Sequence, residues 1–190
     1  LDSEDSYLLS RRTFLAGGIG AASLALAGCN GEGMDNWAAY SAVDGPVSPQ
    51  YRRRRVRFET REKPGTIIVD TSERYLYVVE DNGMATRYGV GVGRAGFAWS
   101  GRAKVGRKAE WPTWTPPPQM IRRQPELKKY AGGMKGGPNN PLGARAMYLY
   151  SGGRDTMYRL HGTNQPGSIG RAMSSGCIRM MNADVVHLYN

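Results

Sequence analysis

One histidine and one cysteine lie close together near the end of the chain, among glycines and small polar residues. His161 is followed by Gly162-Thr163-Asn164, and Cys177 follows Ser174-Ser175-Gly176. A thiolate is a strong nucleophile, but a free thiol is mostly protonated at neutral pH unless an imidazole or backbone N–H groups favour its ionised form. A histidine at a strand end and a cysteine on a tight glycine-containing turn supply both. The pattern therefore predicts an acyl-transfer site.

Two other interpretations of the same residues are open. A single cysteine is often a small buried apolar residue, and a single histidine is often a hydrogen-bonded core residue. Cys177, His161 and His187 could also bind zinc together, but the sequence has neither paired cysteines nor the His-x-x-x-His spacing typical of such sites. The sequence therefore predicts no metal site and no organic cofactor.

Three separated blocks of sequence carry a family resemblance. One is the block 161–180, which contains both residues above, and the others are the upstream blocks 111–117 and 140–146. In this order they resemble the signature of the L,D-transpeptidase (YkuD) catalytic domain, whose members act on the stem peptides of bacterial peptidoglycan. The resemblance extends over residues 64–190. It implies a mostly β fold, a mixed β-sandwich with few short helices and a long substrate-covering loop.

The resemblance also implies a role for each site residue. Cys177 is the nucleophile, His161 is the general base and then the general acid, and the backbone carbonyl of Gly162 orients the imidazole. Backbone N–H groups around Gly176 form the oxyanion hole. The side chains expected to contact substrate are Arg179, Ser174, Ser175, Trp111 and Trp114. The planar guanidinium of Arg179 suits a substrate carboxylate, and a structural ion pair is its alternative.

The reaction that the resemblance implies begins when Cys177 attacks the carbonyl between the third stem residue and the terminal D-Ala. D-Ala leaves, a thioester remains, and an amine of a neighbouring stem resolves it to give a 3→3 cross-link. Water as acceptor would make the protein an L,D-carboxypeptidase, and a lysine of an envelope lipoprotein would make it a lipoprotein-linking or -cleaving enzyme. A non-catalytic wall-binding lipoprotein is the alternative from a different class.

The front of the chain resembles an export signal. Ser10-Arg11-Arg12-Thr13-Phe14-Leu15 is similar to a twin-arginine motif, and an apolar run follows it that is too short to span a bilayer, which takes about twenty apolar residues. The run ends in Leu26-Ala27-Gly28-Cys29, which resembles a lipobox with Cys29 as the lipidated residue. Residues 1–29 are therefore expected to be a signal peptide. The protein is expected to be exported, periplasmic and anchored to a membrane through an N-terminal lipid.

The formal net charge is +10, and much of the excess lies in Arg52-Arg53-Arg54-Arg55. Such a run is typical of a solvated linker, but it also suits anionic lipid head groups or cell-wall carboxylates. No fold or stacking pattern for nucleic acids accompanies it, so no nucleic-acid partner is predicted. With the turn signals Gly45-Pro46 and Ser48-Pro49, residues 30–63 are expected to form a basic flexible linker.

Residues 64–190 are expected to form one catalytic domain built mainly from strands. Strands are expected at 66–70, 75–80, 85–92, 102–110, 145–150 and 157–160. Asp81-Asn82-Gly83 is a hairpin signal, and the last strand delivers His161 to its end. A final helix is expected at 183–189 with Asn182 as its N-cap. A further C-terminal strand of the resembled family is expected to be missing from this sequence.

The segment 111–143 has no regular period and is dense in proline and glycine. Loops of this length inside a compact domain usually have a function. Trp111, Trp114 and Tyr130 suit a flap that covers a ligand and excludes water, and core packing at the loop base is the other interpretation of the tryptophans. The glycine pairs 132–133 and 136–137 would let such a flap move.

Overall fold

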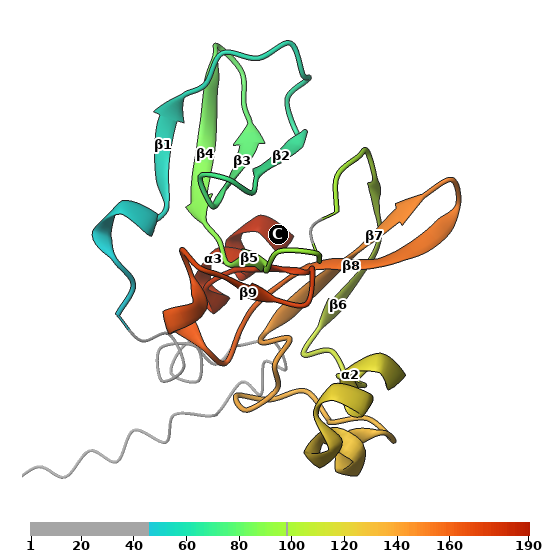
Figure 1. Ribbon diagram of the computed structural model, residues 1–190. Coiled ribbons are helices and arrows are strands. Elements are labelled where there is room, and N and C mark those ends of the chain that lie inside the picture. The colour runs from blue at the N-terminus through green and yellow to red at the C-terminus, as the bar shows by residue number, and fades with distance from the viewer. Residues whose placement is uncertain (1–45, 98) are drawn as a thin grey trace, which may run out of the picture. The chain divides into compact units, whose positions relative to one another are not determined.

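The computed structural model describes residues 46–97 and 99–190. The expected signal peptide and Cys29 lie outside these residues. Strands are the main regular structure of these residues, and they are arranged in two four-stranded sheets and one two-stranded sheet (Figure 1). The helices are short, and none of those in the described ranges is long and apolar enough to cross a bilayer. The expectation of a mostly β fold with few short helices is confirmed.

The first sheet is a run of antiparallel neighbours in the order β1-β4-β3-β2. Its strands are β1 (Arg54–Arg57), β2 (Ile67–Asp70), β3 (Tyr75–Val79) and β4 (Met84–Gly89). β-Branched and aromatic residues dominate β2 and β3, as expected for half-buried strands. Asn82 and Gly83 both have positive φ, 60° and 67°. Positive φ at these residues suits a tight turn, and β3 pairs antiparallel with β4 directly across it, so the hairpin predicted here is confirmed.

The second sheet carries the candidate catalytic residues and has the order β10-β8-β7-β6. Its strands are β6 (Lys104–Glu110), β7 (Arg145–Ser151), β8 (Arg154–His161) and β10 (Ile178–Arg179). The pairs β6–β7 and β7–β8 are antiparallel, whereas β10 runs parallel to β8. A short parallel pair, β5 (Val92–Gly93) with β9 (Ala172–Ser174), lies close to this sheet. These parallel and antiparallel pairs make the fold mixed.

The helical elements are few, and most last only one or two turns. They are η1 (Pro49–Tyr51), α2 (Pro118–Arg123), η2 (Pro125–Tyr130), η3 (Pro166–Ser168) and α3 (Asn182–Tyr189). Each of η1, α2, η2 and η3 begins with a proline, which favours a first helical position because its missing N–H needs no partner there. The helix expected at the end of the chain is α3, and it packs on β7 and β8.

The core is a layer of apolar side chains that come from both large sheets and from α3. Leu76 and Tyr88 belong to the first sheet, Met147 and Leu160 to the second, and Val185 to α3. All five are essentially buried. Burial of such side chains contributes roughly 1.5–3 kcal/mol each. The core therefore fixes the face of β8 that points inward, and the opposite face is left for other side chains.

Residues 46–57 differ from the flexible linker expected over residues 30–63. β1 is an edge strand that pairs with β4, with Val56 directly opposite Ala85. Its arginines are exposed while Val56 is partly buried, which suits an edge strand with one apolar inward position. Tyr51 lies against Gly89 and Gly170. The arginine run thus belongs partly to a sheet edge, where its charges also guard against edge-to-edge pairing.

The long segment between β6 and β7 has structure of its own. It contains α2 and η2, and Trp114 pairs with Met134 through two backbone hydrogen bonds of 2.9 and 2.7 Å. The rings of Trp114 and Tyr130 are 6.0 Å apart. The predicted absence of a long regular element is correct, but local turns and one bridge fold the segment back on itself.

Substitution of Gly89 tests whether residues 46–57 belong to the folded domain. A Cβ at Gly89 would overlap the backbone and Cβ of Tyr51, so Gly89→Ala should cost about 1–3 kcal/mol of unfolding free energy. Gly167→Ala is the matched control, because nothing lies within 4 Å of its added Cβ. Urea unfolding of the full chain measures both. Equal stability of the two variants would mean that Tyr51 does not pack on β4.

Candidate active site

The parallel pairing of β8 and β10 brings the predicted residues to one face of the sheet. Ile178 lies beside Leu160 and Arg179 lies beside His161. Because side chains alternate along a strand, His161 and Arg159 share the face of β8 opposite Leu160. Cys177 precedes Ile178 and so shares a face with Arg179. The nucleophile candidate and the base candidate are therefore diagonal neighbours across adjacent strands.

His161 is held in one orientation. Its side chain is buried, and its Nδ1 lies 2.5 Å from the backbone carbonyl oxygen of Gly162. A carbonyl can only accept a hydrogen bond, so Nδ1 carries the proton and Nε2 carries the free lone pair. The backbone of the same residue is fixed as well, because Met180 N–H donates to the His161 carbonyl at 2.8 Å. This arrangement presents Nε2 as a base.

The imidazole is also held neutral. Burial lowers the pKa of His161 to about 4, the hydrogen bond to Gly162 opposes this, and the positive charges of Arg179 and Arg159 lower it further. Loss of solvation and like charge both disfavour the protonated ring. At neutral pH the residue is therefore a neutral acceptor of a proton.

The turn that carries Cys177 is held by the hydroxyl of Ser174. Ser174 Oγ donates to the Cys177 carbonyl at 2.6 Å and accepts the Gly176 N–H at 3.1 Å. Gly176 has φ 121°, and a Cβ there would lie 2.5 Å from the Tyr158 ring, so only glycine fits. The Gly176 N–H, expected in an oxyanion hole, is used inside the turn. The N–H of Cys177 has no partner within the described residues and is the remaining donor at this position.

The thiol of Cys177 lies over the strand β8. Its Sγ is 3.8 Å from the carbonyl oxygen of Met157. Burial has the largest effect and brings the pKa of the thiol above its ordinary value, although the backbone N–H of Arg159 and the guanidinium groups of Arg159 and Arg179 oppose it. The sulfur is still partly exposed, so a substrate can reach it.

Arg179 is available to bind an anion. It donates a hydrogen bond of 3.1 Å to the neutral amide oxygen of Gln165, and it pairs with no carboxylate of residues 46–97 and 99–190. It lies next to His161 in the register. A guanidinium with this freedom, two residues from Cys177, suits a substrate carboxylate. Ser175, the other predicted contact, is exposed in the nucleophile turn.

The two predicted tryptophans occupy different surroundings. Trp111 packs against the buried Ala144 and Val186, so it is part of a small core cluster at the base of the long segment. Trp114 packs within that segment. The segment reaches the nucleophile turn through another residue: the Arg123 guanidinium of α2 lies 5.3 Å from the Phe97 ring, and the Phe97 carbonyl packs against Gly176.

Two buried asparagines that sequence reasoning missed support the site. Asn182 was expected to be the N-cap of the last helix, but Met181 takes the N-cap position and Asn182 is the first residue of α3. Its Oδ1 accepts from the Ala144 N–H and its Nδ2 donates to the Thr163 carbonyl, both at 3.0 Å. Asn140 Nδ2 similarly donates to the carbonyl of Pro112 at 3.0 Å. The signal for Asn140 was a polar residue inside the block 140–146, without a stated role, whereas Asn182 lies just after the block 161–180.

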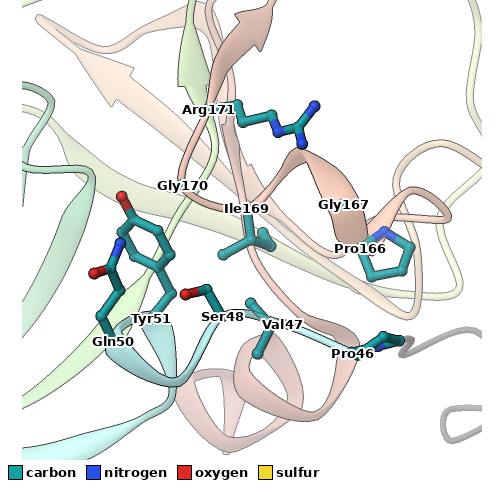
Figure 2. Close-up of a pocket in the computed structure, with 10 residues that line it drawn as sticks. All are labelled: Pro46, Val47, Ser48, Gln50, Tyr51, Pro166, Gly167, Ile169, Gly170 and Arg171. Atoms are coloured by element: carbon teal, nitrogen blue, oxygen red, sulfur yellow. The ribbon is translucent and has the colours of Figure 1, made fainter.

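Two hollows border these residues. The larger, about 590 Å³, is lined by apolar side chains of both sheets, and it reaches the nucleophile turn at Gly176 beside Tyr158 and Trp99. The smaller, about 340 Å³, is formed where residues 46–51 face residues 166–171, with Tyr51 near Gly170 (Figure 2). Neither hollow is lined by Cys177 or His161, and of the two only the larger reaches the turn that carries Cys177.

The three residues that could have formed a zinc site, Cys177, His161 and His187, make separate contacts. His187 is on α3, and its Nδ1 lies 2.8 Å from the Tyr88 hydroxyl. Within residues 46–97 and 99–190 there is no group of three His, Cys, Asp or Glu side chains arranged to hold a metal ion.

Comparison with known proteins assigns the family. Residues 64–190 match the model of the YkuD family, the L,D-transpeptidase catalytic domain. This match covers more than half of the chain, and it contains every residue of the site described above. The chain therefore belongs to the L,D-transpeptidase (YkuD) catalytic domain family.

Individual relatives agree with this assignment. A putative L,D-transpeptidase of Fuscovulum blasticum is 33% identical over 184 residues, which cover 95% of this chain and 92% of that protein. The probable L,D-transpeptidase ErfK/SrfK of Escherichia coli (strain K12) is 35% identical over 130 residues, which cover 65% of this chain and 40% of that protein. The chain thus matches less than half the length of the E. coli relative.

A solved structure shares the fold as well. It is a Brucella melitensis protein described as a probable carnitine operon oxidoreductase, with a TM-score of 0.57 and 48% sequence identity. The match covers 79% of this chain and 90% of that one. The words "carnitine operon oxidoreductase" describe the Brucella protein alone.

The burial of His161 makes a testable prediction about protonation. His161 should stay neutral, with the proton on Nδ1, until the pH falls to about 4, whereas an ordinary histidine titrates near 6.5. Because the folded pKa is below the unfolded value, the contribution of His161 to stability is full above about pH 6.5 and is lost as the pH falls towards 4. The chain has two histidines, so ¹⁵N NMR of the His187→Gln variant isolates His161. A midpoint near 6.5 would contradict its burial.

Proposed function

We propose that the protein is a peptidoglycan L,D-transpeptidase with Cys177 as its nucleophile. The observation that carries this proposal is the parallel pairing of β10 with β8, which brings Cys177, the residue directly before β10, close to His161, whose Nδ1 is bonded to the Gly162 carbonyl. Membership of the YkuD family supports the reaction class. The substrate is the tetrapeptide stem of peptidoglycan, and no metal or organic cofactor takes part in the proposed reaction.

Acylation starts from a neutral pair. The Cys177 thiol transfers its proton to Nε2 of His161 as the sulfur attacks the carbonyl between the third stem residue and D-Ala. The carbonyl oxygen becomes an oxyanion, and the N–H of Cys177 is the donor placed to stabilise it. Loss of one such donor typically costs about 3–4 kcal/mol of transition-state stabilisation.

Breakdown of the tetrahedral intermediate uses the same imidazole as an acid. Because the protonated ring is buried beside Arg159 and Arg179, it is a strong acid and gives its proton readily to the leaving amine of D-Ala. A thioester between Cys177 and the third stem residue remains. An amine of a second stem then attacks the thioester carbonyl, passes its proton to Nε2 and releases the thiol, which leaves a 3→3 cross-link.

The substrate is held by groups around this centre. Arg179 binds a carboxylate of the stem, and Ser175 lies at the surface of the turn beside the attacked carbonyl. Ser174 acts on the turn itself rather than on substrate, because both sides of its hydroxyl are used there. Among the predicted tryptophans, Trp114 remains the candidate for substrate contact, and the packing of Trp111 supports a structural role.

The acceptor decides between related activities. Water in place of the second stem gives an L,D-carboxypeptidase, and a lysine of an envelope lipoprotein gives a lipoprotein-linking enzyme. All three share the thioester on Cys177. We favour transpeptidation because the family model and the curated relatives above are named for it.

The proposed location follows from the front of the sequence. A twin-arginine signal and a lipobox ending at Cys29 would export the protein and anchor it in a membrane, with the catalytic domain in the periplasm. There the arginines of β1 and its flanks meet anionic lipid or cell-wall carboxylates. No nucleic acid is proposed as a partner.

A muropeptide assay tests the reaction. The full chain, incubated with a disaccharide-tetrapeptide, should give cross-linked dimers together with released D-Ala in the mass spectrum. Cys177→Ala should abolish both products, because the proposed nucleophile is lost, and His161→Ala should slow thioester formation by a factor of at least about 100. Gly167→Ala is a suitable control, since its added Cβ meets nothing.

Each alternative gives a different result in that assay. Tripeptide without dimer would identify a carboxypeptidase. Turnover in Cys177→Ala would exclude the proposed nucleophile. Binding of the muropeptide without any covalent change would favour the wall-binding lipoprotein.

A further inference from the structure

The strand that carries His161 contains a bulge directly beneath the thiol. Tyr148 of β7 lies opposite Arg159 and Tyr150 lies opposite Asp155, so Leu149 alone faces the three residues 156–158 of β8. At the centre of the bulge Met157 has φ 64°, although it is not glycine, and its side chain is 65% exposed. Such a conformation costs about 1–3 kcal/mol and persists only where neighbouring groups hold it. Neighbouring groups must therefore hold Met157 in this strained conformation.

The carboxylate of Asp155 stabilises the bulge through hydrogen bonds to two residues of β8. Its Oδ1 accepts the Met157 N–H at 2.8 Å. The same carboxylate receives both terminal nitrogens of Arg159, at 2.7 and 2.8 Å. Burial raises the pKa of Asp155, but the Arg159 and Met157 hydrogen bonds outweigh it and bring the pKa below its ordinary value. Asp155 is therefore ionised at neutral pH and fixes two groups at once.

The two residues that Asp155 holds, Met157 and Arg159, also contact Cys177, through other backbone groups than those bonded to Asp155. The Met157 carbonyl lies 3.8 Å from Sγ, and the backbone N–H of Arg159 points at the sulfur. These two backbone groups lie on one edge of β8, two residues apart, as alternation along a strand requires. The sulfur thus has an acceptor for its proton and a donor for its lone pair, both from the bulged segment.

The Arg159 guanidinium adds a fixed positive charge. Its side chain is only 12% exposed, and it lies 4.4 Å from the centre of the Tyr148 ring. Unlike Arg179, the Arg159 guanidinium already binds a carboxylate of the protein, that of Asp155. It is therefore not placed to bind a substrate carboxylate. A poorly solvated cation near a thiol favours the thiolate.

We propose that Asp155 is a positioning residue for the nucleophile: it locks the β8 bulge so that Met157 and Arg159 hold the Cys177 sulfur and the Arg159 charge stabilises its thiolate. This proposal rests on the proposed function for its relevance to catalysis. It explains how a partly buried thiol becomes reactive although its histidine is a weak base. The cation also makes the imidazolium a stronger acid, so it assists at both proton transfers.

Removal of the Asp155 charge should change the reactivity of Cys177 in opposite directions under the positioning role and under a simple through-space charge effect. Through space alone, the negative charge of Asp155 raises the thiol pKa, so removing it should make Cys177 more reactive at pH 7. If Asp155 positions the sulfur contacts, its removal should make Cys177 less reactive. Asp155→Asn keeps an acceptor for the Met157 N–H and loses the fork to Arg159, whereas Asp155→Ala loses both.

The experiment is the pH profile of iodoacetamide alkylation, followed by mass spectrometry on the Cys177 peptide of the full chain. We expect Arg159→Gln to move the midpoint to higher pH and to slow alkylation at pH 7 roughly three- to tenfold. Arg159→Lys should fall between Arg159→Gln and wild type. Asp155→Asn should be slowed, and Asp155→Ala slowed more. Arg154→Gln, which removes an exposed charge from the same strand, should leave the profile unchanged.

Several outcomes would overturn the proposal. One is faster or unchanged alkylation in Asp155→Asn, and another is a profile of Arg159→Gln that matches Arg154→Gln. If Asp155→Ala does not fold by circular dichroism, Asp155→Asn and Arg159→Lys still decide the matter. The readout needs no stem peptide, so the expected profiles without muropeptide turnover would count against the proposed function alone. Turnover with unchanged profiles would count against the positioning role alone.

Discussion

The site depends on the pairing of two residues of β10 with the end of β8. Two parallel pairs, Ile178 with Leu160 and Arg179 with His161, decide which side chains face the apolar core and which lie on the opposite face of the sheet. Leu160 enters the apolar layer with Met147 and Val185, and this burial fixes the register. A slip by one residue would turn His161 and Arg159 towards the apolar core and Leu160 away from it. The hydrophobic core thereby determines the geometry of the chemistry on the opposite face.

A two-residue ladder is too short to hold a turn by itself, and side chains supply the rest. Ser174 closes the nucleophile turn from within, while Asn182 joins the segments before β7 and after β8. These bonds run from side chain to buried backbone groups, which would otherwise lose their water without replacement. Glycine is required where backbones approach: a Cβ at Gly162 would meet the Asn182 amide and the Gly143 backbone. The catalytic segments are therefore fixed by polar contacts at glycine positions.

Sequence alone predicted the parts of this architecture that have a local signal. The alternation of β3, the Asn82-Gly83 turn and the glycine before Cys177 can each be derived from a few neighbouring residues. The roles of Asp155 and Arg159 could not, because they depend on a bulge that is defined only by the partner strand. Asn182 suited a helix cap by local rules, but its amide satisfies long-range backbone groups instead. The arginines of β1 looked like linker, since an edge strand with one inward valine has almost no periodic signal.

The charges around the site explain why a buried histidine, a cysteine and two arginines occur together. A buried histidine near two arginines is a weak base, and burial also raises the pKa of the Cys177 thiol. The two arginines act against burial at the thiol, where they favour the thiolate, and at His161 they disfavour a stable imidazolium. A carboxylate bonded to the imidazole would instead stabilise the imidazolium and leave it a poorer acid towards the leaving amine. The neutral carbonyl of Gly162 orients the ring without that penalty, which is a physical reason for the proposed triad to end in a backbone oxygen.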